Sequence, residues 1–192
     1  GDHGLNICNT YTADYFMNKN LDLLSASYDL NSEQLKDLYR NYGGQNFEMV
    51  IHHYMPAFHM EHCLYAAFLS KGHTEKDCGK PCERHKVEVK DPKGVFHYLK
   101  PDQECRNTMY HGVPQSADRL IREAHSLGVS HFRIESLWET NEELRTKVIA
   151  YYDYIKGDFN SWELHDRLGE VEKYGLGEGR LFKVDHWEDR KK

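Results

Sequence analysis

Four of the five cysteines have a spacing that suits a metal centre. Cys78 and Cys82 flank the short segment Gly79-Lys80-Pro81, and a further cysteine lies at some distance on either side of this pair. A tight loop of this kind supplies neighbouring thiolates, and the returning chain completes the coordination shell. The pattern predicts a metal ion or an iron–sulfur cluster held by Cys63, Cys78, Cys82 and Cys105.

The spacing leaves alternatives open. Three residues between close-set cysteines favour a cluster only weakly over zinc, whose sites more often have two. Buried unreactive thiols or disulfides are also possible, although five cysteines leave at least one unpaired in any disulfide scheme. The sequence shows no secretory signal, so we expect an intracellular protein that is not secreted.

Strand-like and helical segments alternate along the chain, which is typical of parallel α/β folds. Asn31 and Gln34 have the spacing of a capping box, and Gly43-Gly44 would end the helix that they begin. A β-hairpin is expected between Val87 and Leu99. The expected parallel strands cover residues 5–9, 21–28, 47–54 and 131–134, and the main helices cover residues 12–18, 31–42, 116–127 and 141–156.

Four such strand–helix units amount to half of an eight-stranded barrel, which typically needs about 250 residues. We therefore predict an α/β fold, a partial (half) TIM-type barrel that spans residues 1–173. A cysteine-rich insert would occupy about residues 60–110, and residues 174–192 would form an extended arm. Because a half-barrel leaves parallel edges open, we expect it to pair with a missing N-terminal half or with another protein subunit.

Barrel enzymes carry their active sites at the carboxyl ends of the strands. On that geometry the candidate catalytic residues are Asp29, His53, Glu61, Arg106 and Glu135. Each has a plainer alternative: Asp29 could be a turn residue, and Glu135 could simply pair with Arg133. Strand alternation sends His52 and His53 to opposite faces, so they should not share a site.

Composition limits the class of protein. The 25 Lys and Arg residues against 31 Asp and Glu residues give a net charge of −6, which argues mildly against broad binding to nucleic acid but leaves room for a local basic patch. No apolar run approaches the roughly 20 residues of a membrane span. The common serine-hydrolase, nucleotide-binding and zincin motifs are absent from the sequence.

Several motifs resemble the U32 peptidase family. HYMPAFHMEHC at 53–63, followed by DCGKPCERH at 77–85, is similar to its cysteine-bearing region. SYDLNSEQL at 27–35, CRNT at 105–108 and GVSHFRIE at 128–135 resemble further family segments in the same order. Two positions depart from the family pattern: Ser70 stands where a second cysteine is usual, and Glu104 replaces a small residue.

The resemblance implies an α/β barrel of which this chain matches the C-terminal half, and a [4Fe–4S] cluster on four cysteines. It implies either peptide hydrolysis, as the family name says, or oxygen-independent hydroxylation of RNA or a related substrate such as ubiquinone. RNA is then a possible partner. Two non-enzymatic alternatives are a structural subunit of a larger assembly and a zinc-stabilised binding module.

Overall fold

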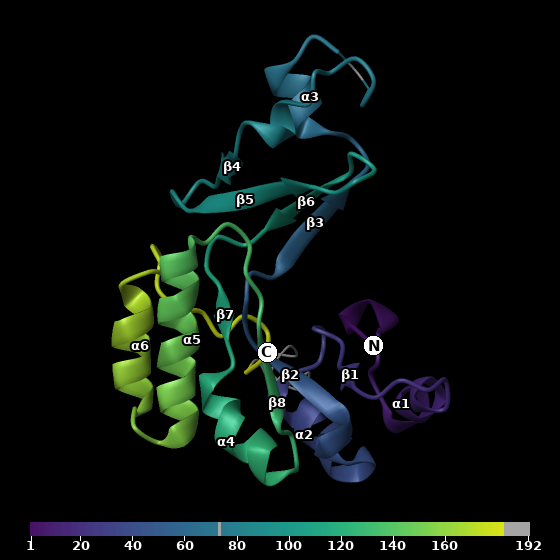
Figure 1. Cartoon of the computed structure of the whole chain (residues 1–192), viewed down its shortest axis with the longest axis vertical. Helices are drawn as coiled ribbons and strands as arrows, with labels where there is room; N and C mark the ends of the chain where they lie inside the picture. The colour runs from purple at the N-terminus through teal and green to yellow at the C-terminus, as the bar shows by residue number, and fades with distance from the viewer. Residues whose placement is uncertain (73, 183–192) are drawn as a thin grey trace, which may run out of the picture. The chain divides into compact units, whose positions relative to one another are not determined.

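A computed structural model describes residues 1–72 and 74–182. The chain divides into two compact units (Figure 1). One, called here the α/β unit, combines Gly1–His53 with the chain from Gln115 onward, and the other, the cysteine unit, is Tyr54–Pro114. No helix in the described part of the chain is long and apolar enough to cross a membrane.

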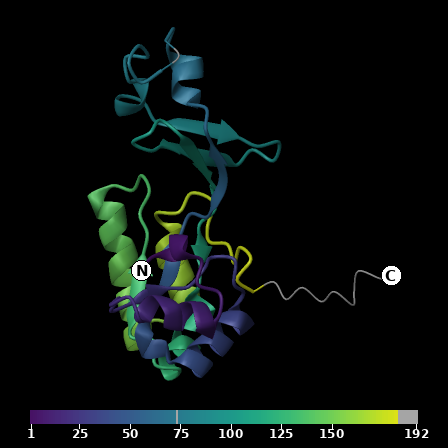
Figure 2. The same ribbon diagram turned by 90° about the vertical axis from the view of Figure 1, so that its right-hand side faces the viewer.

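The sheet of the α/β unit is built around β2 (Phe47–His53). β1 (Leu24–Ser25) and β8 (His131–Ile134) run parallel to β2, and β7 (Gln115–Ser116) pairs with its end in the antiparallel direction. The helices of this unit, shown in Figures 1 and 2, are α1 (Thr10–Met17), α2 (Ser32–Tyr42), α4 (Asp118–Ser126), α5 (Asn141–Lys156) and α6 (Ser161–Gly169), with 3-10 turns at His3–Leu5 and Gly44–Asn46.

The core of this unit forms where β2 meets the helices. Phe47, Met49 and Ile51 alternate along the strand and are at most 3% exposed. They belong to one apolar cluster with Leu38 of α2 and Leu120 of α4. Each fully buried side chain of this size contributes about 1.5–3 kcal/mol to stability. This cluster holds β2 firmly and so fixes the position of the side chains at its carboxyl end.

Helix α2 begins and ends as the sequence predicts. The Asn31 side chain accepts a hydrogen bond from the Gln34 backbone at 3.0 Å, and the Gln34 side chain accepts one from the Asn31 backbone at 3.0 Å. Gly43 follows the helix with φ of 102°, a conformation that favours glycine. The capping box and the glycine stop are therefore confirmed.

The cysteine unit carries an antiparallel sheet in the order β3-β6-β5-β4. Its strands are β3 (Pro56–Met60), β4 (Val87–Lys90), β5 (Phe96–Pro101) and β6 (Asn107–Tyr110), accompanied by α3 (Leu64–Leu69) and a 3-10 turn at Pro81–Glu83. The predicted hairpin is confirmed as β4–β5. In its turn the Asp91 carboxylate accepts hydrogen bonds from the backbones of Lys93 and Val95 at 2.9 Å each.

The mixed α/β class is confirmed, while the half-barrel stays a prediction. Two of the expected strands are wrong in extent. Residues 5–9 form no strand because Asn6 adopts a left-handed φ of 50°, so only Ile7 makes an isolated bridge, with Ala26. The strand expected over residues 21–28 shrinks to Leu24–Ser25, since only these two residues lie opposite β2.

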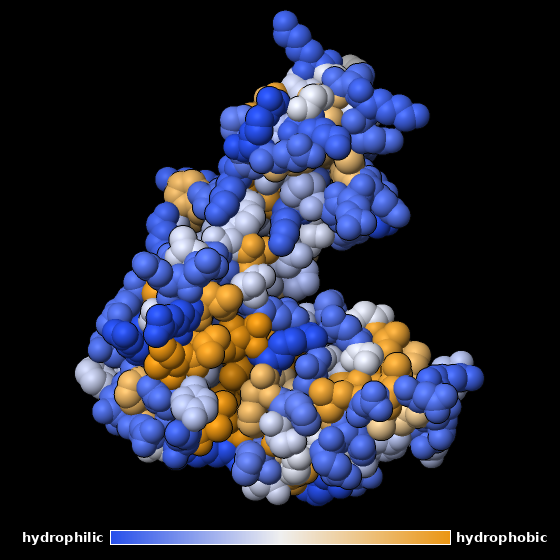
Figure 3. All heavy atoms as spheres, in the orientation of Figure 1, coloured by the Kyte–Doolittle hydropathy of each residue, from blue (hydrophilic) through white to orange (hydrophobic). Residues whose placement is uncertain are grey.

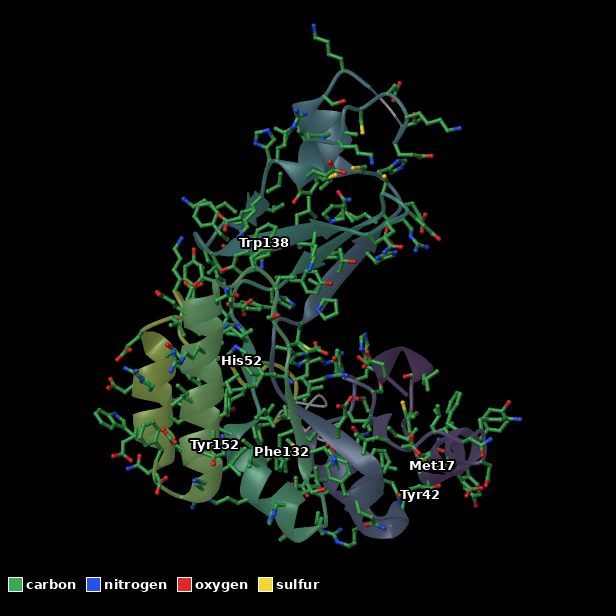
Figure 4. The ribbon with its side chains drawn as sticks, viewed as in Figure 1. Met17, Tyr42, His52, Phe132, Trp138 and Tyr152 are labelled. Atoms are coloured by element: carbon green, nitrogen blue, oxygen red, sulfur yellow. The ribbon has the colours of Figure 1, made fainter. Side chains whose placement is uncertain are left out.

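The apolar residues of α5 are only partly buried. Tyr151 is buried, but Val148, Tyr152 and Ile155 are 48%, 55% and 41% exposed. The helix packs instead through Lys147, Ala150, Tyr151 and Tyr154. Figure 3 shows apolar side chains gathered over the region of α5 and β8, and Figure 4 labels Tyr152 and Phe132 there. The α/β unit thus exposes an apolar face.

The segment predicted as an extended arm lies partly outside the described residues. In its described part, Leu181 is only 4% exposed and belongs to the apolar core. Its backbone carbonyl accepts a hydrogen bond from Ser32 at 2.6 Å, at the start of α2. This portion therefore packs on the α/β unit.

Candidate functional site

Four of the cysteines lie in the cysteine unit, and none of the five is in a disulfide. Cys63 is the residue that precedes α3, and Cys82 lies within the 3-10 turn Pro81–Glu83. Cys78 ends the turn before Cys82, where its backbone donates to the Thr74 carbonyl at 3.0 Å. Cys105 lies in the loop between β5 and β6. Each of the four is half-buried, whereas Cys8 in the other unit is exposed.

Electrostatics shows that these four sulfurs are neighbours. The pKa of the Cys105 thiol is raised, first by burial and then by the negative charges of Cys63, Glu75, Cys78 and Cys82. Coulombic effects fall with distance, so influence from three other thiols requires that they lie close by. All four cysteines that the sequence singled out therefore lie in one region of the cysteine unit, although no three of their sulfurs lie within 4.8 Å of one another; here they are called the cysteine centre.

Hydrogen bonds hold the segments of the cysteine centre in register. The buried Asn107 side chain, at the start of β6, accepts a hydrogen bond from the Leu64 backbone at 2.7 Å. This bond ties the residue after Cys63 to the residue that lies two places after Cys105. In the same unit, the Tyr65 hydroxyl of α3 donates to the Leu99 carbonyl at 2.7 Å.

Two local loops shape the ligand positions. The Lys80 backbone donates to the Cys78 sulfur at 3.4 Å, with Lys80 in a left-handed φ of 48°. Cys105 has φ of 65°, and the Asp102 carboxylate supports this loop by accepting from the Glu104 and Arg106 backbones at 2.9 Å each. Two non-glycine residues in left-handed conformations beside the thiols indicate loops whose shape is imposed by their surroundings.

The cysteine centre has the donor set that a thiolate-bound metal requires. Burial raises the pKa of the Cys105 thiol most, and repulsion from the nearby thiols when they are ionised raises it further. A bound cation removes this cost and deprotonates its ligands. Cys63, Cys78, Cys82 and Cys105 therefore fit an iron–sulfur cluster by their chemistry, and they also fit zinc.

Two predicted catalytic residues, Glu61 and Arg106, lie close in sequence to residues of the cysteine centre. The Arg106 guanidinium pairs with Asp102 and Glu104 at 2.9 Å each. It is thus engaged by its own loop and does not present an open carboxylate-binding fork. Glu61 is exposed in the bend after β3, and its charge contributes to the raised pKa of Arg106.

The other predicted residues lie in the α/β unit. His53 ends β2 and Glu135 directly follows β8, so both occupy the carboxyl ends of parallel strands, as the sequence predicts. The His53 Nδ1 lies 3.7 Å from Glu135 Oε2. Asp29 does not join them in any described contact; its backbone donates to the Ser27 hydroxyl at 3.4 Å, in a turn.

His53 and Glu135, at the ends of β2 and β8, are called here the strand-end site. The sequence did not identify several residues that contact them. The Tyr28 hydroxyl donates to Glu135 Oε1 at 2.5 Å. Arg133 contacts Glu135 at 2.9 Å, the pairing that the sequence analysis gave as an alternative to a catalytic role. Arg133 also contacts Asp2 at 2.6 Å and Glu48 at 2.7 Å. Strand alternation places Arg133 and Glu135 on one face of the sheet, so the sequence could have indicated their contact. Nothing local pointed to Asp2.

The protonation states at the strand-end site follow from its contacts. Burial acts to raise the pKa of Glu135, but the nearby His53 ring, the hydrogen bond from Tyr28 and the charge of Arg133 lower it overall. Burial and the neighbouring Glu135 carboxylate raise the pKa of Tyr28. At neutral pH the site thus holds an ionised carboxylate beside a neutral phenol.

Buried polar atoms without partners surround this site. His53 is 2% exposed, and its Nδ1 makes no hydrogen bond in the structure; the same is true of Gln115 Oε1 and Arg133 Nε. A cavity of about 30 Å³ is lined by His53 and Gln115, together with Tyr28 and Glu48. Unsatisfied polar atoms at a cavity are uncommon in native proteins and indicate a place for a ligand or water.

His52 belongs to a different environment, as alternation predicts. It is fully buried and contacts Tyr151 at 3.2 Å and Glu172 at 3.0 Å (Figure 4). Lys147, 1% exposed, pairs with the same Glu172 and with Glu139. This buried polar network joins β2 to α5 and has a structural role.

Comparison with protein families gives one match, to Peptidase family U32, over residues 3–181. That range includes the cysteine centre and the strand-end site but not Asp2. No curated protein and no solved structure matches the chain.

Proposed function

The chain belongs to peptidase family U32, and from this premise we propose that it is an iron–sulfur protein whose cysteine centre binds a [4Fe–4S] cluster. The observation that carries the proposal is that Cys63, Cys78, Cys82 and Cys105 are unpaired thiols of one unit, and that the charges of the first three act on Cys105. Thiolates are the ligands of such clusters. A cysteine in place of Ser70 is not needed to complete four ligands, because these four cysteines can supply them.

A bound cluster supplies electron transfer. We propose that this serves oxygen-independent hydroxylation of RNA or a related substrate. The chain's own contribution is to hold the four thiols through Asn107 and the two strained loops. In the α/β unit the ionised Glu135 and the neutral Tyr28 offer hydrogen-bonding groups for a polar substrate.

We propose further that the α/β unit is completed by an N-terminal barrel half or by another subunit. Among the described residues, β8 pairs only with β2, so its other edge presents unpaired backbone groups. Exposed apolar residues lie on the neighbouring α5: Val148, Ile149, Tyr152 and Ile155. An edge and an apolar face of this kind are normally covered.

Anaerobic purification followed by iron, sulfide and zinc analysis tests the cluster. We expect about four irons and four sulfides per chain, and a broad absorption band in the visible region. A variant with all four cysteines of the centre changed to serine should lose both, while Cys8→Ser should keep them. Stoichiometric zinc with no iron would support the binding-module alternative instead, and a metal-free wild-type protein would refute the proposal.

The reaction is tested with the same variants. Hydroxylated nucleosides are measured in RNA from cells that carry the wild type or the four-cysteine variant, and we expect them only with the wild type. Cleavage of denatured collagen that survives the cysteine substitutions would favour the peptidase alternative. A wild-type protein that shows neither activity would favour a structural subunit.

A further inference from the structure

We propose that Asp2, His3 and Glu135 form a binding site for a divalent cation in the α/β unit, distinct from the cysteine centre. One ligand-type atom from each residue lies within 4.8 Å of the other two, and no other such group of three occurs in residues 1–72 and 74–182. Two carboxylates and an imidazole suit Mn²⁺, Fe²⁺ or Zn²⁺. The proposal does not depend on the proposed cluster.

The charge balance of the strand-end site favours a cation. Three carboxylates, those of Asp2, Glu48 and Glu135, share the single guanidinium of Arg133. A divalent cation would balance the carboxylate charge that this one guanidinium leaves over.

Arg133 contacts only one oxygen of each of the two carboxylates that would bind the cation. Its guanidinium binds Oδ1 of Asp2 and Oε1 of Glu135. Among the described residues, the hydrogen bonds of the Asp2 carboxylate, from the His3 backbone, His3 Nδ1 and Arg133, all reach Oδ1. Glu135 Oε2 lies 3.7 Å from His53 Nδ1. A carboxylate can bind a cation through one oxygen while the other accepts from a neighbouring donor.

His53 is the independent observation that points to a ligand. Its side chain is 2% exposed, its Nδ1 has no hydrogen-bond partner, and this atom is directed at Glu135 Oε2. Its other ring nitrogen lies 3.2 Å from the Gln115 amide. A small shift of Glu135 would close the 3.7 Å gap to a hydrogen bond, so His53 is a positioning residue that orients a metal-bound carboxylate.

The ligand count indicates what the cation could do. Three protein ligands leave coordination positions open, as in catalytic metal sites, whereas structural sites are closed by four. Water or an oxygen-bearing substrate would occupy the open positions. The Tyr28 hydroxyl, which already donates to Glu135 at 2.5 Å and whose ring stacks on His3, lies beside them.

Binding of Mn²⁺ to the full chain, measured by electron paramagnetic resonance and calorimetry, tests the site. Mn²⁺ prefers oxygen and nitrogen ligands over thiolates, which separates this site from the cysteine centre. We expect binding of one ion, weakened at least about tenfold by Glu135→Gln and by Asp2→Asn. Asp2 is 61% exposed in its side chain, so Asp2→Asn should fold even if Glu135→Gln does not.

The controls separate this proposal from the cluster. Glu178→Gln removes a carboxylate that pairs with Arg119 elsewhere on the unit, and it should leave Mn²⁺ binding unchanged. His53→Phe should weaken binding about tenfold without changing the number of ions. The four-cysteine variant should bind Mn²⁺ as the wild type does. Wild-type affinity no greater than that of both Glu135→Gln and Asp2→Asn, or loss of binding in the four-cysteine variant, would overturn the site.

Discussion

The Tyr28 hydroxyl and the Glu135 carboxylate meet at 2.5 Å, although 107 positions separate them in the chain. The bond connects the turn after β1 with the end of β8, two strands that both pair with β2. Hydrogen bonds to a charged acceptor are stronger than those between neutral groups. This contact therefore helps to hold the strand-end site in one arrangement.

Tyr28→Phe tests that role. The substitution removes the hydroxyl but keeps the ring that stacks on His3 at 4.3 Å. We expect the free energy of unfolding to fall by about 1.5–3 kcal/mol, the range for hydrogen bonds to charged groups. Urea unfolding monitored by circular dichroism measures it. Tyr11→Phe, at a side chain that is 87% exposed, is the matched control and should change stability by less than about 0.5 kcal/mol.

Substitution of Lys147 should lower the free energy of unfolding more than Tyr28→Phe does. Its ammonium is buried and pairs with Glu139 at 2.6 Å and with Glu172. Lys147→Met would leave two buried carboxylates without this cation, which costs about 3–5 kcal/mol. The same unfolding measurement applies, with Lys156→Met on the exposed surface of α5 as the control. A loss below about 1 kcal/mol would mean that water reaches the network and screens it.

His52 should make stability depend on pH. Burial lowers the pKa of His52 from its ordinary value of 6.5, so the unfolded chain binds this proton more readily than the folded chain. The stability that comes from keeping His52 neutral is complete above pH 6.5 and is lost as the pH falls below that value. The decline has a slope of at most about 1.4 kcal/mol per pH unit.

Melting temperatures of the wild type and His52→Gln between pH 7.5 and 5 measure this dependence. We expect the variant to show a shallower decline, whatever its absolute stability. His85→Gln, at an exposed histidine of the cysteine unit, should keep the wild-type slope. Equal slopes in all three proteins would show that His52 is not the group responsible.

Local chemistry explains which parts of the fold were predictable. The capping box of Asn31 and Gln34 and the hairpin turn at Asp91 depend on neighbouring residues, and both are confirmed. β2 was predictable because its apolar residues alternate. The exposed side of α5 was not, because Tyr151 and Tyr152 look equivalent in the sequence and only tertiary packing buries the first.

Some of the functional residues could be identified from the sequence and others could not. Cysteine spacing identified the four thiols that converge, and strand ends identified His53 and Glu135 as neighbours. Asp2 and Tyr28 could not be found, since each reaches the site through contacts with residues more than 100 positions away. The sequence also did not show that Arg106 pairs with two carboxylates of its own loop, and its catalytic role stays a prediction.

Asn107 provides a test of the cysteine centre that alters no thiol. Its side chain is fully buried and accepts the Leu64 backbone hydrogen bond at 2.7 Å, so it links the segments of Cys63 and Cys105. Asn107→Ala should release this link and leave a buried backbone donor unsatisfied, at a cost of about 1–3 kcal/mol. Because the thiols would then be less well placed, we expect the iron content after anaerobic purification to fall several-fold.

The neighbouring Thr108→Val is the matched control for that experiment. It removes a hydroxyl that contacts His59 at 3.0 Å on the exposed part of β6, so it perturbs the same strand without touching the link. Iron content should therefore stay at the wild-type level in Thr108→Val and fall in Asn107→Ala. If Asn107→Ala retained full iron while its stability fell as expected, the thiols would hold their arrangement through the two loops around Lys80 and Cys105 alone. Loop rigidity, rather than the bond from Leu64, would then be what assembles the centre.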